Sequence, residues 1–476
     1  MATAIRPPAP EAFGSPLPSP DARAARGRAA RREVPRSTHA VWEPRADRRS
    51  PVDVLEGESA DRLPDLVGVR YGRMLRSPFA FFRGTASIMA ADLAGTPRSG
   101  IDAQLCGDAH LANFGGYGSP ERALVFDIND FDETAAGPWE WDVKRLAASV
   151  ALAARDLEMA PAARRRAVRR TVRSYRRAMR RFAGMGDLDA WYTRLDVATI
   201  LATAERRMGA KRRRGLEQRL DGARARDSLR ALRKLTSQED GEPRFVSRPP
   251  LIVPVRELLP EAGREGVEDE MRRLLRAYAA SLPPDRRRLV GGYRYVDMAR
   301  KVVGVGSVGR RAWIVLLAGR DGADALVLQV KEARGSVLAP FVGGDPAANQ
   351  GRRVVEGQQL MQAASDILLG WLRADGDGGA RDYYVRQLWD WKVSADVERL
   401  APAGLTDYGA MCGWTLARAH ARSGDRIAIA AYLGGGDVFD RALAEFAEAY
   451  ADRAERDYAA LEDAARAGRI AAERDM

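Results

Sequence analysis

Residues 106–113 read Cys-Gly-Asp-Ala-His-Leu-Ala-Asn, and residues 125–132 read Val-Phe-Asp-Ile-Asn-Asp-Phe-Asp. Phosphoryl transfer needs a carboxylate that accepts the proton of the substrate hydroxyl, and it needs oxygen ligands for Mg²⁺. Asp108 and Asn113 have the five-residue spacing at which one loop supplies both groups. Either residue alone is typical of an ordinary turn. The loop followed by a strand and a second acidic loop favours a catalytic site instead, with Asp108 accepting the proton and Asn113 binding metal.

The second acidic loop follows an apolar strand that the pattern predicts over residues 123–128. Asp130, which precedes Phe131, is placed to bind the metal ion that bridges the phosphates. Asp132 is a further candidate metal ligand, and Asp127 competes with both. The residue types alone do not separate these three carboxylates.

A glycine-rich segment lies far downstream. Gly304, Gly306 and Gly309 have the GxGxxG spacing, which lets a loop approach a phosphate closely. Because the flanking residues read as strands, they predict a β-hairpin clamp over nucleotide phosphates and not a strand–loop–helix dinucleotide site. Lys331 ends the next strand, where such a lysine is catalytic and pairs with the α- and β-phosphates of ATP. The chain has only six lysines against 71 arginines, which disfavours an incidental surface lysine here.

The residues after Lys331 give further expectations. A helix is predicted from about residue 351 to 372, and Glu356 on it is the expected partner of Lys331. A strand over 383–388 would reach the hinge between two lobes, where backbone groups near Gln387 contact adenine. If both distant segments form one site, its expected ligands are ATP and Mg²⁺.

The stretch from Cys106 to Ala148 resembles the catalytic core of aminoglycoside-phosphotransferase-like kinases, whose loop reads roughly H-G-D-x-H-x-x-N. In those kinases an Asp-Phe metal motif and a G-D-P-x-x-D-L-A-like segment follow. Residues 137–142, Gly-Pro-Trp-Glu-Trp-Asp, are similar to that last segment. The interval between Asp130 and this segment suits the pattern of those kinases. Asp130 is therefore preferred over Asp127 as the metal ligand. The sequence departs from the family at Cys106, where the first histidine would stand.

From about Arg36 onward, the chain also resembles the bacterial "domain of unknown function 2252" family. The stretches that carry this resemblance are 70–74, 77–79, 106–115, 126–146, 357–366 and 416–425. The resemblance implies a protein-kinase-like fold whose activity is open.

The acidic loops and the glycine segment come in the reverse of the order found in ordinary kinases. Here Asp108 and Asp130 precede Gly304 and Lys331. A circular permutation accounts for this order, since new termini are tolerated at a protein surface. The predicted fold is α+β and protein-kinase-like, with a large helical lobe and a small antiparallel β lobe. The expected units are a disordered basic, proline-rich tail (1–32), a helical lobe with the acidic loops (33–290), a β-rich nucleotide-clamping lobe (291–395) and a helical segment returning to the helical lobe (396–476).

The net charge of +12 raises the alternative of a nucleic-acid-binding module. The densest basic stretch is 164–181. It predicts an amphipathic helix whose arginines are solvated, because apolar side chains recur in it at helical spacing. These are Val168, Val172, Tyr175, Met179 and Phe182. A nucleic-acid partner is therefore disfavoured.

Composition excludes several other classes. The chain has 476 residues, 46% hydrophobic and 30% charged, which suits a soluble globular protein of two or three domains. It contains no apolar run long enough to span a membrane and no secretory signal. Cys106 and Cys412 form no metal-ligand pattern and are expected to be free thiols in a reducing cytosol. We therefore expect a cytoplasmic protein without a membrane partner.

Together these features predict an ATP- and Mg²⁺-dependent phosphotransferase whose hydroxyl acceptor, a small molecule or a protein, is not readable from the sequence. A nucleotide-binding pseudokinase and an adenylyl transferase on the same fold are the alternatives, because a fold does not determine a reaction. The retained acidic and lysine residues disfavour an inactive site, but they do not separate phosphoryl from adenylyl transfer.

Overall fold

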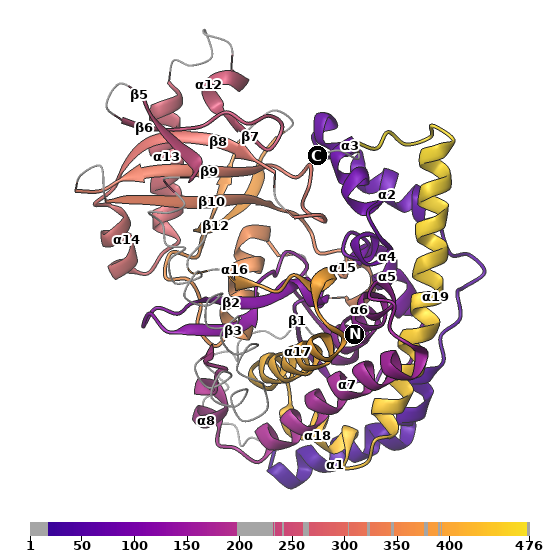
Figure 1. Ribbon diagram of the computed structural model, residues 1–476. Coiled ribbons are helices and arrows are strands. Elements are labelled where there is room, and N and C mark those ends of the chain that lie inside the picture. The colour runs from indigo at the N-terminus through magenta and orange to yellow at the C-terminus, as the bar shows by residue number, and fades with distance from the viewer. Residues whose placement is uncertain are drawn as a thin grey trace.

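The computed structural model places a six-stranded antiparallel sheet beside a body of helices, with the strands β2 (Phe114–Gly118) and β3 (Leu124–Ile128) between them (Figure 1). The described residues run from 18 to 473, with gaps at 198–231, 233, 240–241, 260–265, 303, 321–323, 344–346, 376–378, 389–390 and 392. Helices and antiparallel sheets together confirm the predicted α+β class.

The six-stranded sheet has the strand order β11-β12-β10-β9-β8-β7. Its strands are β7 (Ile252–Pro254), β8 (Arg294–Lys301), β9 (Ala312–Ala318), β10 (Ala325–Ala333), β11 (Gly370–Ala374) and β12 (Arg381–Gln387). Along β9, Ile314 and Leu316 pack into one hydrophobic cluster, while Val315 and Leu317 pack into another. Alternate side chains of a strand point to opposite faces, so both faces of this sheet are buried. This explains why β9 reads as a continuous apolar run.

Several elements that pack with the sheet precede β8 in the chain. They are β5 (Thr236–Glu239), β6 (Glu242–Phe245), α12 (Val255–Leu258), α13 (Val267–Ala280) and α14 (Pro284–Val290). Phe245 packs on one face of the sheet, and Tyr278 and Leu282 pack on the other. The helical lobe was predicted to extend to residue 290, whereas the described elements β6, α13 and α14 pack with the sheet. Helical spacing indicates a helix but not the body on which it packs.

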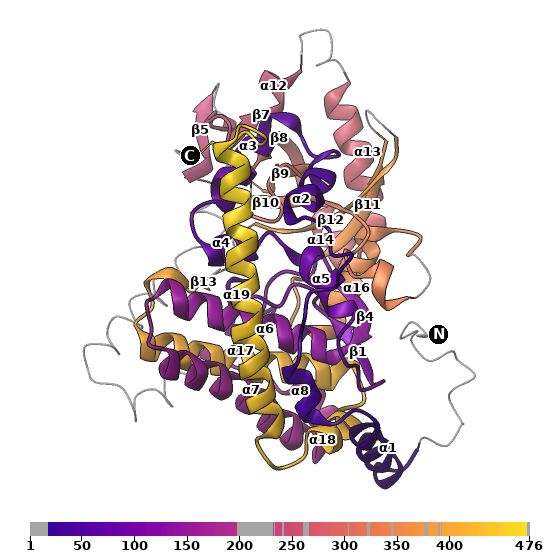
Figure 2. The same ribbon diagram turned by 90° about the vertical axis from the view of Figure 1, so that its right-hand side faces the viewer.

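The helical body contains most of the remaining elements. They are α2 (Pro51–Ser59), α3 (Pro64–Met74), α4 (Pro78–Phe82), α5 (Ala86–Ala94), α6 (Trp139–Asp156), α7 (Pro161–Ala183), α8 (Asp187–Tyr192), α17 (Pro402–Ser423), α18 (Arg426–Leu433) and α19 (Val438–Arg466). The long helix α19 runs along this body in Figure 2 and packs against α2, α6 and α7. The C-terminal helices therefore pack with helices from the first half of the chain.

Helices α7 and α17 cross at close range because glycines lie at their contact. A Cβ atom on Gly409 would lie 2.5 Å from Thr171 Oγ1, and one on Gly413 would overlap the Thr171 carbonyl oxygen. The α17 backbone can reach α7 here only because these side chains are missing.

The N-terminal tail contains a helix that the sequence analysis did not predict. α1 (Pro20–Glu33) begins at Ser19, whose side chain accepts a hydrogen bond from Ala22 N. Arg23 pairs with Asp425 at 3.0 Å, and a Cβ atom on Gly27 would overlap the backbone of α18. The predicted disorder is therefore wrong for residues 20–32, and residues 1–17 lie outside the described part. Because α1 packs on its neighbours through glycine and alanine, its sequence shows no stripe of large apolar side chains that would predict a buried helix.

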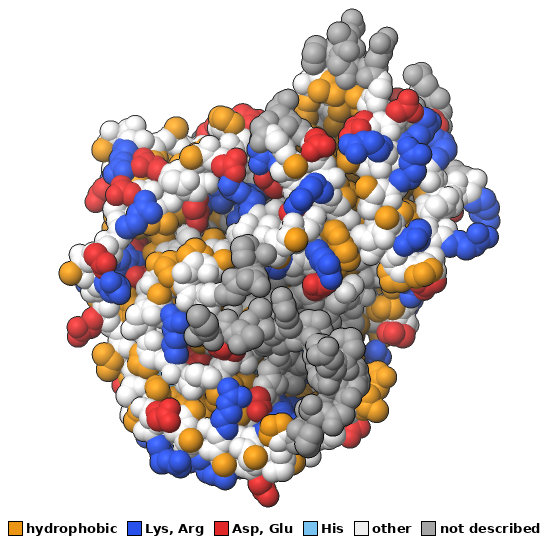
Figure 3. Space-filling view, turned by 180° about the vertical axis from the view of Figure 1, so that it is seen from behind, with side chains coloured by type: hydrophobic (Ala, Val, Ile, Leu, Met, Phe, Trp, Pro, Cys, Tyr) orange, Lys and Arg blue, Asp and Glu red, His pale blue; other side chains and the backbone are white. Residues whose placement is uncertain are grey.

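The basic helix predicted over 164–181 is confirmed as part of α7, with its apolar stripe buried. Several of its arginines pair with carboxylates of α17, α19 and the residue before α19: Arg164 with Glu448, Arg169 with Asp437, Arg170 with Asp407, and Arg176 with Asp440. On the face shown in Figure 3, basic and acidic side chains are interspersed. Within the described residues, no helix is long and apolar enough to cross a membrane.

Candidate functional site

The first acidic loop is held at its start by the helix that follows it in the fold. The loop leaves β1 (Asp102–Leu105), which pairs with β4 (Ala135–Pro138) just before α6. Asp142, in the first turn of α6, accepts hydrogen bonds from Cys106 N (2.8 Å) and Gly107 N (3.1 Å). Gly107 has a φ of +84°, and a Cβ atom there would overlap the Glu133 carbonyl oxygen. Asp142 and Gly107 thus fix the backbone that presents Asp108.

Asp108 lies beside a buried arginine. Arg145 Nε donates to Asp108 Oδ1 at 2.6 Å, and His110 Nε2 is 3.6 Å from Asp108 Oδ2. Burial raises the pKa of Asp108 above its usual value, while Arg145 acts in the opposite direction. Burial, together with Arg83 and Arg145, holds the pKa of His110 well below its usual value, so this imidazole is neutral near pH 7. Asp108 is therefore a stronger base than an exposed aspartate.

Asn113 closes the same loop. Its Nδ2 donates to the Asp108 carbonyl oxygen at 2.9 Å. No hydrogen bond within the described residues uses its Oδ1 atom, which leaves this oxygen available as a ligand. Asn113 lines the same cavity as Asp130.

The structure separates the three carboxylates of the second loop. Asp127 is buried, forms an ion pair with Arg418 and accepts a hydrogen bond from Ala363 N at 3.0 Å. Its carboxylate oxygens therefore stabilise the fold. The Asp130 side chain is 29% exposed and lines the cavity. Asp132 also lines it and accepts a hydrogen bond from Tyr384 OH at 2.6 Å. Asp130 and Asp132 thus remain candidate metal ligands, and Asp127 does not.

Lys331, on β10, joins the two distant segments. Its Nζ lies 3.7 Å from Asp130 Oδ2 and 3.5 Å from Asp132 Oδ2, and its side chain is buried. Lys331 and Arg310 outweigh the effect of burial and hold the pKa of Asp132 well below its usual value. The lysine and these carboxylates, predicted from separate stretches, therefore lie in one cleft.

The glycine segment forms the loop between β8 and β9 and reaches the same cleft. Gly304 and Gly309 have φ angles of +66° and +83°, which suit glycine. Ser307 Oγ donates to Asp132 Oδ2 at 3.3 Å, and Gly306 also lines the cavity. Arg62, in the α2–α3 connection, donates to the carbonyl oxygens of Gly306 and Val308 at 2.8 and 2.5 Å. The loop thus lies against the helical body.

The predicted pairing of Glu356 with Lys331 is wrong. Glu356 lies on α16 (Gln350–Met361), forms an ion pair with Arg352 and is 55% exposed. Gln358, two positions further along the helix, is buried and lines the cavity instead. Two helical positions differ by about 200° in direction, so the two residues occupy opposite faces of α16.

Gln387 does line the larger cavity, but its donors are occupied. Its backbone N–H and its Nε2 donate to the carboxylate oxygens of Asp366 at 2.5 and 2.7 Å, and Leu388 N donates to Val327 O. These N–H groups are not free to bind adenine in this arrangement. Trp389 lies outside the described residues.

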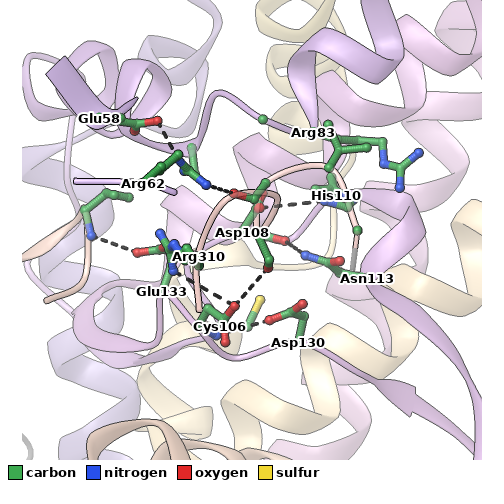
Figure 4. Close-up of a pocket in the computed structure, with 18 residues that line it drawn as sticks. Glu58, Arg62, Arg83, Cys106, Asp108, His110, Asn113, Asp130, Glu133 and Arg310 are labelled. Carbon is green, nitrogen blue, oxygen red and sulfur yellow. Dashed lines mark hydrogen bonds and ion pairs between the residues drawn. The ribbon is translucent and has the colours of Figure 1, made fainter. Parts of the chain in front are cut away.

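The cleft contains two adjoining spaces. The larger cavity measures about 690 Å³ and is lined by Asn113, Asp130, Lys331 and Gln387, among others. The smaller chamber measures about 90 Å³ and lies between Asp108 and the glycine loop. Figure 4 shows this chamber, with Arg62, Glu58, Glu133 and Arg310 on one side and Arg83 and His110 on the other.

The basic side chains that line the cleft were not predicted from the sequence. Arg62, Arg83 and Arg310 border the smaller chamber, and Arg386 borders the larger cavity. Nothing marks these four among 71 arginines. Their role depends on contacts between distant segments, which a single sequence does not show.

The donor set fits Mg²⁺ when a phosphate completes it. In the described residues, no three or more His, Cys, Asp or Glu side chains are grouped to hold a metal ion. Asp130, Asp132 and the Asn113 amide provide two carboxylates and one neutral oxygen. Mg²⁺ is commonly held by one or two carboxylates together with substrate phosphates and water.

The fold and the site define an α+β protein with an internal cleft that combines a buried lysine, acidic loops and a glycine loop. The chain belongs to the family described as "Uncharacterized protein conserved in bacteria (DUF2252)", whose model matches residues 62–464. No curated protein and no solved structure matches the chain significantly.

Proposed function

We propose that the protein is an ATP- and Mg²⁺-dependent phosphotransferase with a circularly permuted, protein-kinase-like fold. The observation that carries this proposal is the position of Lys331 Nζ, 3.7 Å from Asp130 Oδ2 and 3.5 Å from Asp132 Oδ2. Residues far apart in the sequence thus form one cluster of the type that binds a nucleotide and its metal.

The order of elements in the sheet supports the kinase-like assignment. A glycine loop connects β8 to β9, the lysine lies on β10, the third strand counted from β8, and helix α16 comes before β11. Protein kinases have a glycine-rich loop over the phosphates, a lysine on their third strand and a helix that positions it. The acidic loops precede this unit here, as a permutation requires.

Each residue has a distinct role in the proposed reaction. Asp108 accepts the proton of the acceptor hydroxyl, and its raised pKa improves it as a base. Lys331 neutralises phosphate charge, while Asn113, Asp130 and Asp132 supply oxygen ligands. Bound Mg²⁺ would offset the negative charge of the phosphates. Asp142 and Arg145 hold Asp108 in place.

The size of the larger cavity suits a nucleotide. Its volume of about 690 Å³ lies within the range of about 300–1,000 Å³ that is usual for small-molecule sites. Gln329, Gln358 and Arg386 line it with polar groups beside Lys331. Because Cys106 and Cys412 are free thiols and the proposed substrate is ATP, we place this activity in the cytoplasm.

A nucleic-acid-binding function is not proposed. That alternative depended on the arginine face of α7, where four arginines are paired with carboxylates of neighbouring elements. Paired arginines have less charge available for phosphate contacts.

The proposal is tested by analysing the products formed from ATP. The wild type should release ADP in a Mg²⁺-dependent reaction, and Asp130→Asn should lose that release while remaining folded. Pyrophosphate in place of ADP would indicate adenylyl transfer, and ATP binding without products would indicate a pseudokinase. Turnover that survives in Asp130→Asn would contradict the assigned site.

A further inference from the structure

Most carboxylates around the smaller chamber have a close cationic partner. The pairs are Glu58 with Arg70 at 2.5 Å, Asp108 with Arg145 at 2.6 Å, Glu133 with Arg310 at 3.0 Å and Asp132 with Lys331 at 3.5 Å. Two further cations line the chamber, Arg62 and Arg83, and neither has a carboxylate of its own at such distances.

Arg62 is almost completely buried, with a side chain only 3% exposed. Its nearest carboxylate oxygen, Glu58 Oε2, is 3.9 Å away and already binds Arg70. Its Nη1 donates to the carbonyl oxygens of Gly306 and Val308, which are uncharged, and its Nε has no hydrogen-bond partner among the described residues. Burial, together with Arg70 and Arg310, lowers the pKa of Arg62 to about 8. The positive charge at Arg62 is therefore incompletely compensated.

Arg83 lies on the other side of the chamber, at the end of α4, and also borders the larger cavity. Its side chain is 25% exposed, and its nearest carboxylate oxygen, on Glu398, is 4.0 Å away. Its Nε is buried without a hydrogen-bond partner in the described chain. Burial lowers the pKa of Arg83 as well. Neutral His110 adds no positive charge beside it.

We propose that Arg62 and Arg83 form a binding site for a tetrahedral oxyanion of the phosphate class in the chamber next to Asp108. Arginine binds phosphate oxygens through its forked N–H groups. The chamber measures about 90 Å³. By the same measure one water molecule needs about 10–15 Å³, so the chamber has room for a phosphate-sized group. The inference rests on the proposed function for the identity of the anion, because two sources supply it. One is the terminal phosphoryl group of the nucleotide, and the other is a phosphate carried by the acceptor.

The site is tested by calorimetric titration of the full-length protein with inorganic phosphate at low ionic strength. Arg83→Gln should weaken phosphate binding at least tenfold, which corresponds to about 1.4 kcal/mol. Arg83→Lys should fall between Gln and the wild type, because lysine keeps the charge but loses the fork. Arg62→Gln gives a second, independent variant. Arg76→Gln is the matched control, since Arg76 is exposed and borders only the larger cavity.

Titrations in the presence of nucleotide identify the source of the anion. If the site takes the transferred phosphoryl group, phosphate binds together with ADP, and a non-hydrolysable ATP analogue excludes it. If the site takes a phosphate of the acceptor, phosphate binds in the presence of either nucleotide. Both results support an oxyanion site. They distinguish the nucleotide from the acceptor as the source of the bound phosphate.

Two results would overturn the inference: no phosphate binding by the folded wild type, or equal binding by the wild type, Arg83→Gln and Arg62→Gln. Failure of the proposed function gives a different pattern. A protein that binds no nucleotide but still binds phosphate in an Arg83-dependent manner would refute the phosphotransferase and keep the oxyanion site.

Discussion

Asp127 and Asp130 are three residues apart, yet their surroundings give them opposite roles. Asp127 is buried against Arg418, whereas Asp130 faces a cavity and has Lys331 Nζ at 3.7 Å. The sequence supplied the right residue types but could not separate them, because Arg418 approaches from α17, nearly 300 residues downstream. Glu356 shows the same limit, since it was predicted as the partner of Lys331 from its place on the following helix, whereas it pairs with Arg352 and is 55% exposed.

The contrast between these aspartates predicts opposite effects of the same substitution. Asp127→Asn should destabilise the protein by about 3–5 kcal/mol, because it leaves the buried Arg418 without its charge partner. Asp130→Asn should change stability by less than about 1 kcal/mol and remove Mg²⁺-dependent turnover. Urea unfolding of both variants, alongside an assay of ADP release, makes the comparison. Equal loss of stability in the two variants would refute this division of roles.

Arg145 should set the acidic limb of the pH–rate profile. Asp108 acts as a base when deprotonated, so activity should fall as the pH drops through its raised pKa. Arg145 lowers that pKa, and Arg145→Gln should therefore move the acidic limb to higher pH. The measurement is kcat/KM against pH for the wild type and the variant, with circular dichroism as a check on folding. A limb that stays in place would mean that Asp108 is not the titrating base.

At the scale of elements, the sequence patterns predicted correctly the segments in which apolar side chains recur along one buried face. α7 and its apolar stripe follow directly from helical spacing, and β3 from its short apolar run. α16 is shorter than predicted, because residues 370–374 form β11 at the sheet edge and not the end of a helix. α1 was missed because it docks through small residues, which carry no hydrophobic signal.

The crossing of α7 and α17 depends on glycine at the contact and not on glycine elsewhere in α17. Gly413→Ala should cost about 1–3 kcal/mol, since the new Cβ would overlap the Thr171 carbonyl oxygen. Gly404→Ala, in the same helix, has ordinary contact distances of 3.7 and 3.9 Å and should stabilise the protein by about 0.4–1 kcal/mol. Thermal unfolding of the two variants measures the difference. A Gly413→Ala variant as stable as the wild type would contradict the close crossing.

At the scale of the whole molecule, the cleft forms where the sheet meets the helical body. The acidic loops belong to the helical side, and the loop between β8 and β9 and strand β10 belong to the sheet (Figure 1). The sequence allowed this convergence to be predicted, since each segment has a recognisable pattern. It could not predict the arginines around the smaller chamber, because their significance comes only from the charges left unpaired in three dimensions.

The account depends most on the claim that these two sides of the cleft form one nucleotide site. Calorimetric titration of the wild type with ATP, with and without Mg²⁺, tests this claim most directly, with Lys331→Ala as the variant and Glu356→Ala as the control. We predict Mg²⁺-enhanced binding to the wild type and Glu356→Ala, and its loss in Lys331→Ala. ATP binding that is unchanged in a folded Lys331→Ala protein, or absent from the folded wild type, would contradict the account.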